Sequence, residues 1–155
     1  MAIELEVAID TGRSQAEVFT HLVDVERWPE WLIASGIVSV RRADPSSASA
    51  PLAVGTALRI DQRVAGRSAT LDARVTAFEW PSRFAVEGRD ADGITVVIDA
   101  RLTDRAPGTH LVWQLRIGLP FRLRIFESMA RPQVERAARL DLEAFRRRLD
   151  AIAEG

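Results

Sequence analysis

Residues 94–102, ITVVIDARL, carry an apolar side chain at every second position, and residues 111–117, LVWQLRI, repeat this alternation after Pro107 and Gly108. A period of two residues is typical of a strand with one buried and one solvent-facing side. The intervening Pro–Gly turn predicts that the two strands pair antiparallel. An antiparallel sheet is therefore expected at the centre of the fold.

The alternation extends along the chain in the N-terminal direction. Asp90 to Gly93 form a hairpin signal, and opposite charges gather on the solvent-facing side of the strands. Because an antiparallel sheet commonly buries one face and wets the other, the apolar face is expected to meet the rest of the protein. Five further strands are predicted, at residues 3–9, 37–40, 58–64, 71–77 and 84–86, giving a seven-stranded curved antiparallel sheet.

Two short helices are predicted after the first strand. Ser14 and Glu17 have the spacing of a capping box, and apolar residues follow at helical intervals, so a helix is expected over residues 14–23. A second short turn is expected over residues 25–28, ending before Pro29.

The C-terminal segment after Pro120 predicts one long helix. Two starting points are open, because Pro132 either begins the helix or interrupts one that starts near Phe121. We favour the earlier start with a kink at Pro132, since the apolar face shifts round the helix across the proline. The apolar stripe consists of Val134, Ala138, Leu142, Phe145, Leu149 and Ile152. The expected fold class is α+β.

Composition limits the classes of function. The chain has 155 residues, which predicts a single domain over residues 1–155, and its formal net charge of −1 gives no global field that would gather nucleic acid or anionic lipid. Cysteine is absent and only two histidines occur, so we expect no metal and no cofactor. No apolar run approaches the roughly 20 residues of a membrane span, and the N-terminus lacks a signal-peptide pattern. A cytoplasmic monomer or homodimer is expected.

Small residues on the buried side of the sheet suggest a pocket. Ala69, Ala73, Ala77 and Ala100 lie among larger apolar residues on this side. Protein interiors tolerate only small voids, so a concave sheet lined with alanine favours room for a ligand. The alternative is that the alanines let the terminal helix approach closely.

The candidate ligand-binding residues come from the apolar face of the strands, the short helices and the terminal helix. Gln62 shares parity with Ile60 and could offer an amide to a ligand, or could reach solvent at a strand end. Trp28 and Trp31 could gate the pocket mouth, or could anchor the short helices. No catalytic residue is assigned. The full set is Trp28, Trp31, Leu58, Ile60, Gln62, Leu71, Ala73, Val75, Ile98, Trp113, Phe126, Met129 and Gln133.

Several motifs together resemble a known family. The segments AEVF (16–19), LVD (22–24) and ERWPEW (26–31) are similar to the entry motif of the polyketide cyclase/dehydrase branch of the START-like (SRPBCC, Bet v 1-like) superfamily, and WPSRF (80–84) and LDL (140–142) follow in order. The resemblance covers nearly the whole chain. It implies a helix-grip fold, in which the sheet wraps around the C-terminal helix and encloses a pocket. Some aromatase-type relatives place an arginine in the cavity, but parity turns Arg59 outward, and neither Arg59 nor Arg83 is assigned a catalytic role.

Three functions remain open at this point. The leading hypothesis is binding, transport or sequestration of a small hydrophobic molecule, such as a lipid or a polyketide-like aromatic compound. The first alternative is an enzyme of the polyketide cyclase or aromatase type, which folds a reactive chain into a productive conformer. The second is a protein-interaction module of the co-chaperone or toxin-like type, which would use the outer face of the sheet.

Overall fold

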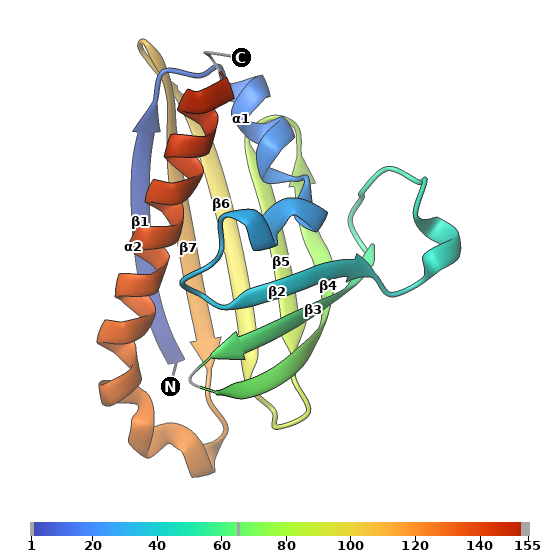
Figure 1. Cartoon of the computed structure of the whole chain (residues 1–155), viewed down its shortest axis with the longest axis vertical. Helices are drawn as coiled ribbons and strands as arrows, with labels where there is room; N and C mark the ends of the chain where they lie inside the picture. Colours follow the sequence, from blue (N-terminus) through green and yellow to red (C-terminus); the bar gives the residue numbers. More distant parts are fainter. Residues whose placement is uncertain (1, 65, 153–155) are drawn as a thin grey trace.

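A computed structural model describes residues 2–64 and 66–152 (Figure 1). Within these residues, seven antiparallel strands form one sheet in the order β1-β7-β6-β5-β4-β3-β2. The predicted seven-stranded antiparallel sheet is confirmed. Its strands are β1 (Ala2–Thr11), β2 (Ile37–Arg42), β3 (Ala57–Val64), β4 (Arg67–Glu79), β5 (Arg83–Arg89), β6 (Thr95–Arg105) and β7 (Gly108–Gly118).

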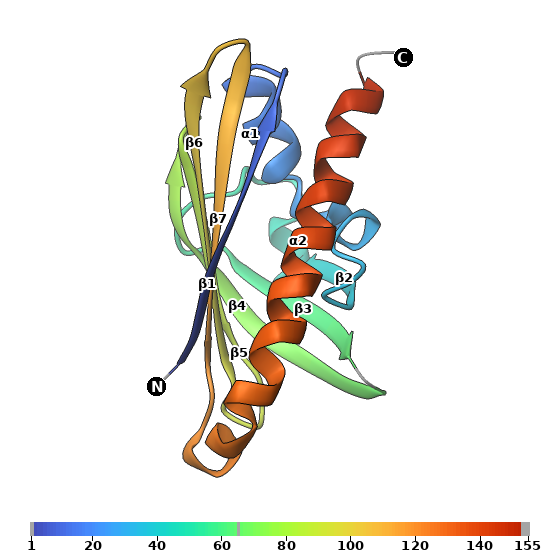
Figure 2. The same cartoon turned by 90° about the vertical axis from the view of Figure 1, so that its left-hand side faces the viewer.

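The first strand lies at one edge of the sheet, where it pairs with the last strand. β1 pairs with β7 from Ala2 opposite Gly118 to Thr11 opposite Thr109. The strands between β2 and β7 follow one another as hairpins, and a register shift between Val75 and Ala77 interrupts the pairing of β4 with β5. Such bulges increase the local bend and twist of a sheet. Figure 2 shows the result, with β2 and β3 curling towards the C-terminal helix.

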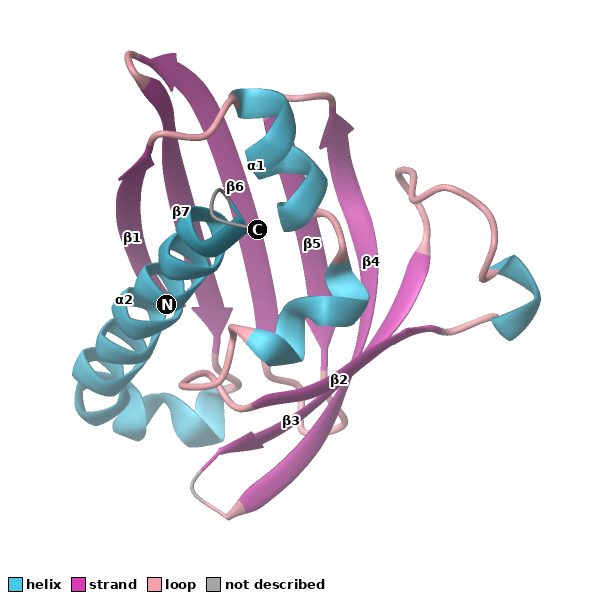
Figure 3. Cartoon of the chain, turned by 45° about the horizontal axis from the view of Figure 1, so that its top comes forward, coloured by secondary structure: helices cyan, strands magenta, loops and turns pink. Residues whose placement is uncertain are grey.

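Helices α1 (Gln15–Leu22) and η1 (Val25–Glu30) and the long terminal helix α2 (Glu127–Ile152) cover the concave face of this sheet (Figures 2 and 3). Helix α1 begins with the predicted serine cap, since the Glu17 amide donates to Ser14 Oγ at 3.2 Å. The Glu17 carboxylate reaches back as expected, but it accepts from the Ser14 hydroxyl at 3.1 Å rather than from the Ser14 amide of a complete capping box. The 3₁₀ helix η1 (Val25–Glu30) follows, as expected, and a further 3₁₀ turn, η2 (Pro45–Ser47), lies in the loop after β2. Neither α1 nor the long terminal helix, as far as it is described, is both long and apolar enough to cross a bilayer.

The terminal helical segment has two parts. The 3₁₀ helix η3 (Phe121–Phe126) precedes the α-helix α2 (Glu127–Ile152), and Pro132 lies inside α2. The favoured early start near Phe121 is therefore correct, but the change in helix type falls at Glu127 rather than at the proline. Pro132 is close to the start of α2, where its missing N–H removes a single intrahelical hydrogen bond.

Packing against the sheet is concentrated in the C-terminal half of α2. Ala138, Leu142, Phe145 and Leu149 are buried there. An aromatic cluster fills the adjoining space, with the Trp31 and Phe145 ring centroids 4.5 Å apart. This half of the groove between sheet and helix is a close-packed core.

Three of the alanines on the sheet belong to this packed half. Ala73 and Ala100 are buried within the main apolar cluster, and Ala77 is buried nearby. Large side chains such as Trp28 and Phe84 belong to the same cluster, so aromatic rings occupy the space that the alanines leave. The expectation that the alanines make room for a ligand is therefore wrong for Ala73, Ala77 and Ala100, whose role is close packing. Ala69 is half-buried and belongs neither to this cluster nor to the cavity wall.

Candidate functional site

A cavity lies between the concave face of the sheet and the N-terminal half of α2. Its volume is about 350 Å³. Strands β2 to β7 supply one wall, and Ala130, Gln133, Val134 and Ala137 of α2 supply the other. The side chains of α2 that face the sheet are thus small or polar before Ala138 and large after it, which leaves this end of the groove unfilled.

The inner end of the cavity is closed by tryptophan. Trp28 and Trp113 line it, with ring centroids 6.1 Å apart, and neither is more than 2% exposed. Trp28 Nε1 donates to the Leu22 carbonyl oxygen at 2.8 Å, so the indole is fixed and its one donor is used. Trp31 lies behind them, 5.6 Å from Trp113 and buried in the core. The burial of both rings supports the alternative that Trp28 and Trp31 anchor the short helix to the core, and not the one in which they gate the mouth of the pocket.

The polar side chains of the lining are uncharged. Among the described residues, they are Ser35, Gln62 and Gln133, and no acidic or basic side chain contributes to the wall. Gln62 Nε2 donates to the Ser35 carbonyl oxygen at 2.9 Å. This bond fixes the carboxamide, and no described group donates to its Oε1. The remaining wall consists of aliphatic and aromatic side chains.

A buried carboxylate holds the loop that forms one rim of the cavity. Asp141 of α2 is only 1% exposed and accepts from the amides of Ala34 and Ser35 at 2.8 and 2.9 Å. Burial raises the pKa of Asp141 above its ordinary value, and the hydrogen bonds from Ser35 and Ala34 oppose this rise only in part. Since Ala34 and Ser35 both line the cavity, Asp141 positions its rim from behind.

The candidate residues predicted from the sequence divide into three groups. Trp28, Ile60, Gln62, Leu71, Ile98, Trp113 and Gln133 line the cavity. Trp31, Leu58, Ala73 and Val75 are buried in the core and do not contribute to its wall. Phe126 and Met129 are exposed, at 47% and 65%, and also lie off the wall.

Several lining residues were missed by the sequence analysis. Val96, Leu115 and Ile117 share the parity of Ile98 and Trp113, so the alternation already carried the signal for them. Ala34 and Ser35 lie in the loop after η1, where no periodicity operates. Their position depends on long-range hydrogen bonds to Asp141, which no local sequence pattern predicts.

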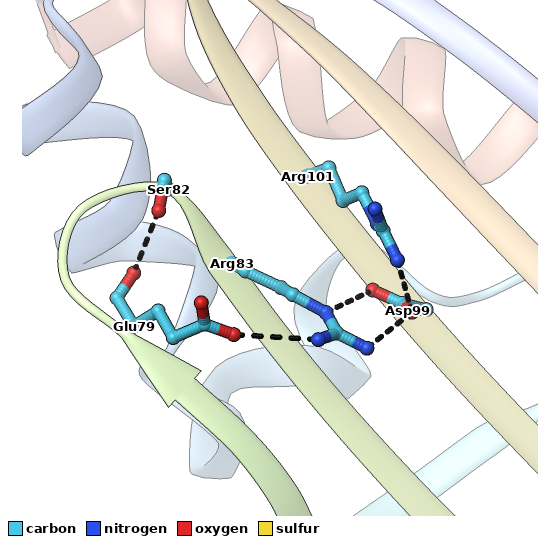
Figure 4. Close-up of polar contacts among 5 residues, drawn as sticks. All are labelled: Glu79, Ser82, Arg83, Asp99 and Arg101. Atoms are coloured by element: carbon cyan, nitrogen blue, oxygen red, sulfur yellow. Dashed lines mark hydrogen bonds and ion pairs between the residues drawn. The ribbon is translucent and has the colours of Figure 1, made fainter.

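Arg83 lies on the opposite face of the sheet from the cavity, where it is fully engaged (Figure 4). Its Nε and Nη2 donate to the two carboxylate oxygens of Asp99 at 3.1 and 2.9 Å, and Nη1 contacts Glu79 at 3.3 Å. The hydrogen bonds that Arg83 donates to Asp99 raise the pKa of Arg83. Burial alone would raise the pKa of Asp99, but Arg83 and Arg101 together hold it below its ordinary value. This ion-pair cluster joins β5 to β6.

Metal-ligating side chains do not converge in the part of the chain that the structure describes. No three His, Asp or Glu side chains there form a group that could hold a metal ion. His110 lies on the outer face, with Nδ1 2.8 Å from Asp10 Oδ1.

Solved structures with this architecture come from varied sources. The protein of unknown function SA2116 from Staphylococcus aureus is 10% identical, with 100% of this chain and 98% of that chain covered and a TM-score of 0.75. A START superfamily protein from Mycobacterium smegmatis is 14% identical, with 96% and 98% covered and a TM-score of 0.70. The di-domain ARO/CYC StfQ from the steffimycin biosynthetic pathway is 10% identical with a TM-score of 0.76, and 100% of this chain covers 53% of that one. These likenesses confirm the expected START-like, helix-grip fold.

Comparison of the sequence with protein families identifies the family of this chain. No curated protein matches this chain significantly. A family model described as polyketide cyclase/dehydrase and lipid transport matches residues 2–150. The chain therefore belongs to the polyketide cyclase/dehydrase and lipid transport family.

Proposed function

We propose that this protein binds a small hydrophobic molecule, such as a lipid or a polyketide-like aromatic compound, in the cavity between the sheet and α2. The observation that carries the proposal is a cavity of about 350 Å³ whose wall is almost wholly aliphatic and aromatic. This volume is at the lower end of the range of about 300–1,000 Å³ typical of ligand pockets. A small guest fits it better than a long-chain lipid with its headgroup enclosed.

The energetics of such a cavity favour an apolar occupant. Empty apolar volume costs on the order of 24 cal/mol per Å³, so a dry cavity of this size would cost as much as a domain's whole stability. Water is a poor filler, because each molecule needs two to four polar partners, and the lining offers few. An apolar guest would recover contact energy along the whole wall.

The polar side chains suggest how a guest would be oriented. Gln62 is held by its bond to the Ser35 carbonyl oxygen, which leaves its Oε1 as an acceptor on the wall. A ligand hydroxyl could donate there. One fixed acceptor in an apolar wall favours broad selectivity with a mild preference for a hydroxylated compound.

Binding can be tested with the intrinsic fluorescence of the cavity tryptophans. Native mass spectrometry of the purified protein would detect a copurified guest, and titration with fatty acids and polyaromatic compounds should quench tryptophan fluorescence saturably at one site. Trp28 and Trp113 line the cavity, so a bound aromatic compound would contact them. The absence of saturable binding across both compound classes would contradict the proposal.

A matched pair of variants on α2 makes the assignment specific. Ala137→Phe places a large side chain in the cavity and should abolish the quenching, whereas Leu140→Phe changes a residue that is 53% exposed and should leave it unchanged. Equal loss in both variants would place the probe somewhere other than the cavity.

A cyclase or aromatase activity is the second candidate, favoured by the family match and by the similarity of the StfQ fold. With no acidic or basic side chain on the described wall, catalysis would rest on the shape of the cavity and on Gln62. Conversion of a poly-β-ketone substrate, lost in Gln62→Ala, would support this activity. Binding of the same substrate without conversion would support the carrier function alone.

A further inference from the structure

One end of the molecule exposes a cluster of large apolar side chains. Phe121 and Ile125 of η3 are 84% and 79% exposed, and Phe126 and Met129 beside them are 47% and 65% exposed. We call these four residues the η3 patch. Figures 1 and 2 show η3 beneath the end of the sheet, at the opposite pole from α1. Contiguous exposed apolar residues of this kind mark an interaction surface.

Several arginine side chains lie beside the η3 patch. A shallow hollow of about 670 Å³ beside η3 is lined by Arg89, Arg116, Arg122 and Arg124, against the acids Glu87 and Asp92. Arg116 and Arg122 have carboxylate partners, Glu4 and Asp92. Arg89 and Arg124 have no ion-pair partner among the described residues, and the Arg124 guanidinium lies 5.9 Å above the Phe121 ring. The hollow therefore favours anionic groups.

The patch adjoins the cavity along the chain. Met129 directly precedes Ala130, and Gln133 follows one turn later; both Ala130 and Gln133 line the cavity. On the other side, Ile117 lines the cavity, whereas its neighbour Gly118 lines the arginine hollow. The end of the sheet thus brings together an apolar surface, a basic hollow and the cavity wall.

We propose that the η3 patch docks on the surface of a bilayer that contains anionic lipids. Exposed phenylalanine and isoleucine side chains enter the boundary between headgroups and acyl chains, while neighbouring arginines stay at the level of the lipid phosphates. Each basic residue near an anionic surface adds to the attraction. A second copy would bring the same excess of arginine to the contact, which favours an anionic bilayer over another copy of this chain as the partner of the patch. This docking does not depend on a guest in the cavity.

The test is sedimentation with phosphatidylcholine vesicles, with and without about 30% phosphatidylserine, at low and high salt. The protein should bind the anionic vesicles, bind the neutral ones much more weakly, and be released by salt. Phe121→Ser combined with Ile125→Ser, and separately Arg124→Glu, should each lower the partition coefficient about tenfold or more. All three side chains are exposed, so the fold should tolerate their replacement.

Matched controls use exposed residues elsewhere. Val54 lies in the loop between β2 and β3, and Arg74 lies on the outer face of β4. The variants Val54→Ser and Arg74→Glu should both bind vesicles as the original protein does. Ala137→Phe should also retain vesicle binding while losing the ligand, which separates this proposal from the cavity function.

Three results would overturn the docking proposal. They are no binding to anionic vesicles at low salt, equal losses in the controls and the patch variants, and a concentration-dependent dimer that the Phe121 and Ile125 substitutions abolish in the absence of vesicle binding.

Discussion

Gln62 is the residue at which ligand selectivity should be decided. Its carboxamide is fixed by the 2.9 Å bond to the carbonyl oxygen of Ser35, and most of the surrounding wall is apolar. A fixed acceptor rewards a ligand hydroxyl without the cost of immobilising the side chain. At the scale of single residues, selectivity should therefore depend on this one group rather than on the many apolar contacts.

Replacement of Gln62 by leucine should change the ratio of two affinities. Gln62→Leu should weaken the binding of 2-naphthol about 2- to 10-fold relative to naphthalene, since a neutral hydrogen bond contributes roughly 0.5–1.5 kcal/mol. Isothermal titration of both compounds measures the ratio and cancels any general disturbance of the cavity. An unchanged ratio would show that the acceptor does not meet the ligand.

Asp61, on the outer face of the sheet, should make the stability of the protein depend on pH. Hydrogen bonds from the Ser39 and Thr70 hydroxyls and from Arg41 lower the pKa of Asp61 from 3.8 to about 2. Because the folded-state value lies below the unfolded one, the stabilisation is complete above the unfolded pKa and is lost as pH falls towards about 2.

The variant Asp61→Asn isolates this contribution. It should be less stable than the original protein by on the order of 1 kcal/mol at neutral pH, and the difference should vanish as the pH falls from about 4 to about 2. Thermal unfolding followed by circular dichroism across this range measures it. A difference that is constant with pH would contradict the assigned cause.

At the scale of elements, Asp141 connects α2 to the loop before β2. The carboxylate satisfies the amides of Ala34 and Ser35, and both of these residues line the cavity. A buried amide without a partner costs about 1–3 kcal/mol. The rim of the cavity therefore depends on a residue that does not touch a guest.

Asp141→Ala should loosen this rim. We expect a loss of on the order of 2 kcal/mol in the free energy of unfolding, with faster hydrogen exchange at Ala34 and Ser35 than at amides within β6. Amide exchange followed by NMR distinguishes this local release from a general loss of stability. Uniform acceleration throughout the chain would count against the positioning role.

The elements also show what sequence reasoning could achieve. Alternation and the Ser14–Glu17 capping box predicted the strands and α1, because these signals are local and fix which face of each strand is buried. The same parity predicted Ile60, Gln62, Ile98 and Trp113 on the cavity wall. Parity could not predict which positions along a strand line the cavity. Leu58 and Val75 share the buried face of their strands, yet they lie in the packed half of the groove.

The change from η3 to α2 sets another limit to prediction. Phe126 and Met129 have the apolar side chains expected of a pocket wall, but both side chains lie on the surface. Their direction depends on how η3 packs beneath the sheet, and hydrophobicity alone does not contain that information. The position of Trp31 behind Trp113 likewise depends on tertiary packing of η1.

For the whole molecule, the central feature is the uneven filling of one groove. Aromatic residues and the C-terminal half of α2 fill one end, whereas small and polar side chains leave about 350 Å³ at the other. A sheet curved by its own twist and bulges cannot be filled along its length by a helix with small residues at one end. The cavity is thus a consequence of where large side chains are placed along α2.

Two neighbouring alanines on α2 test this claim most directly. Ala137 faces the cavity and Ala138, 2% exposed, faces the packed core. The measurement is the free energy of unfolding in denaturant for Ala137→Phe and Ala138→Phe. We expect Ala137→Phe to keep or gain stability, because its ring enters open space, and Ala138→Phe to lose about 1–3 kcal/mol through overpacking. Equal and large losses in both variants would contradict an open groove.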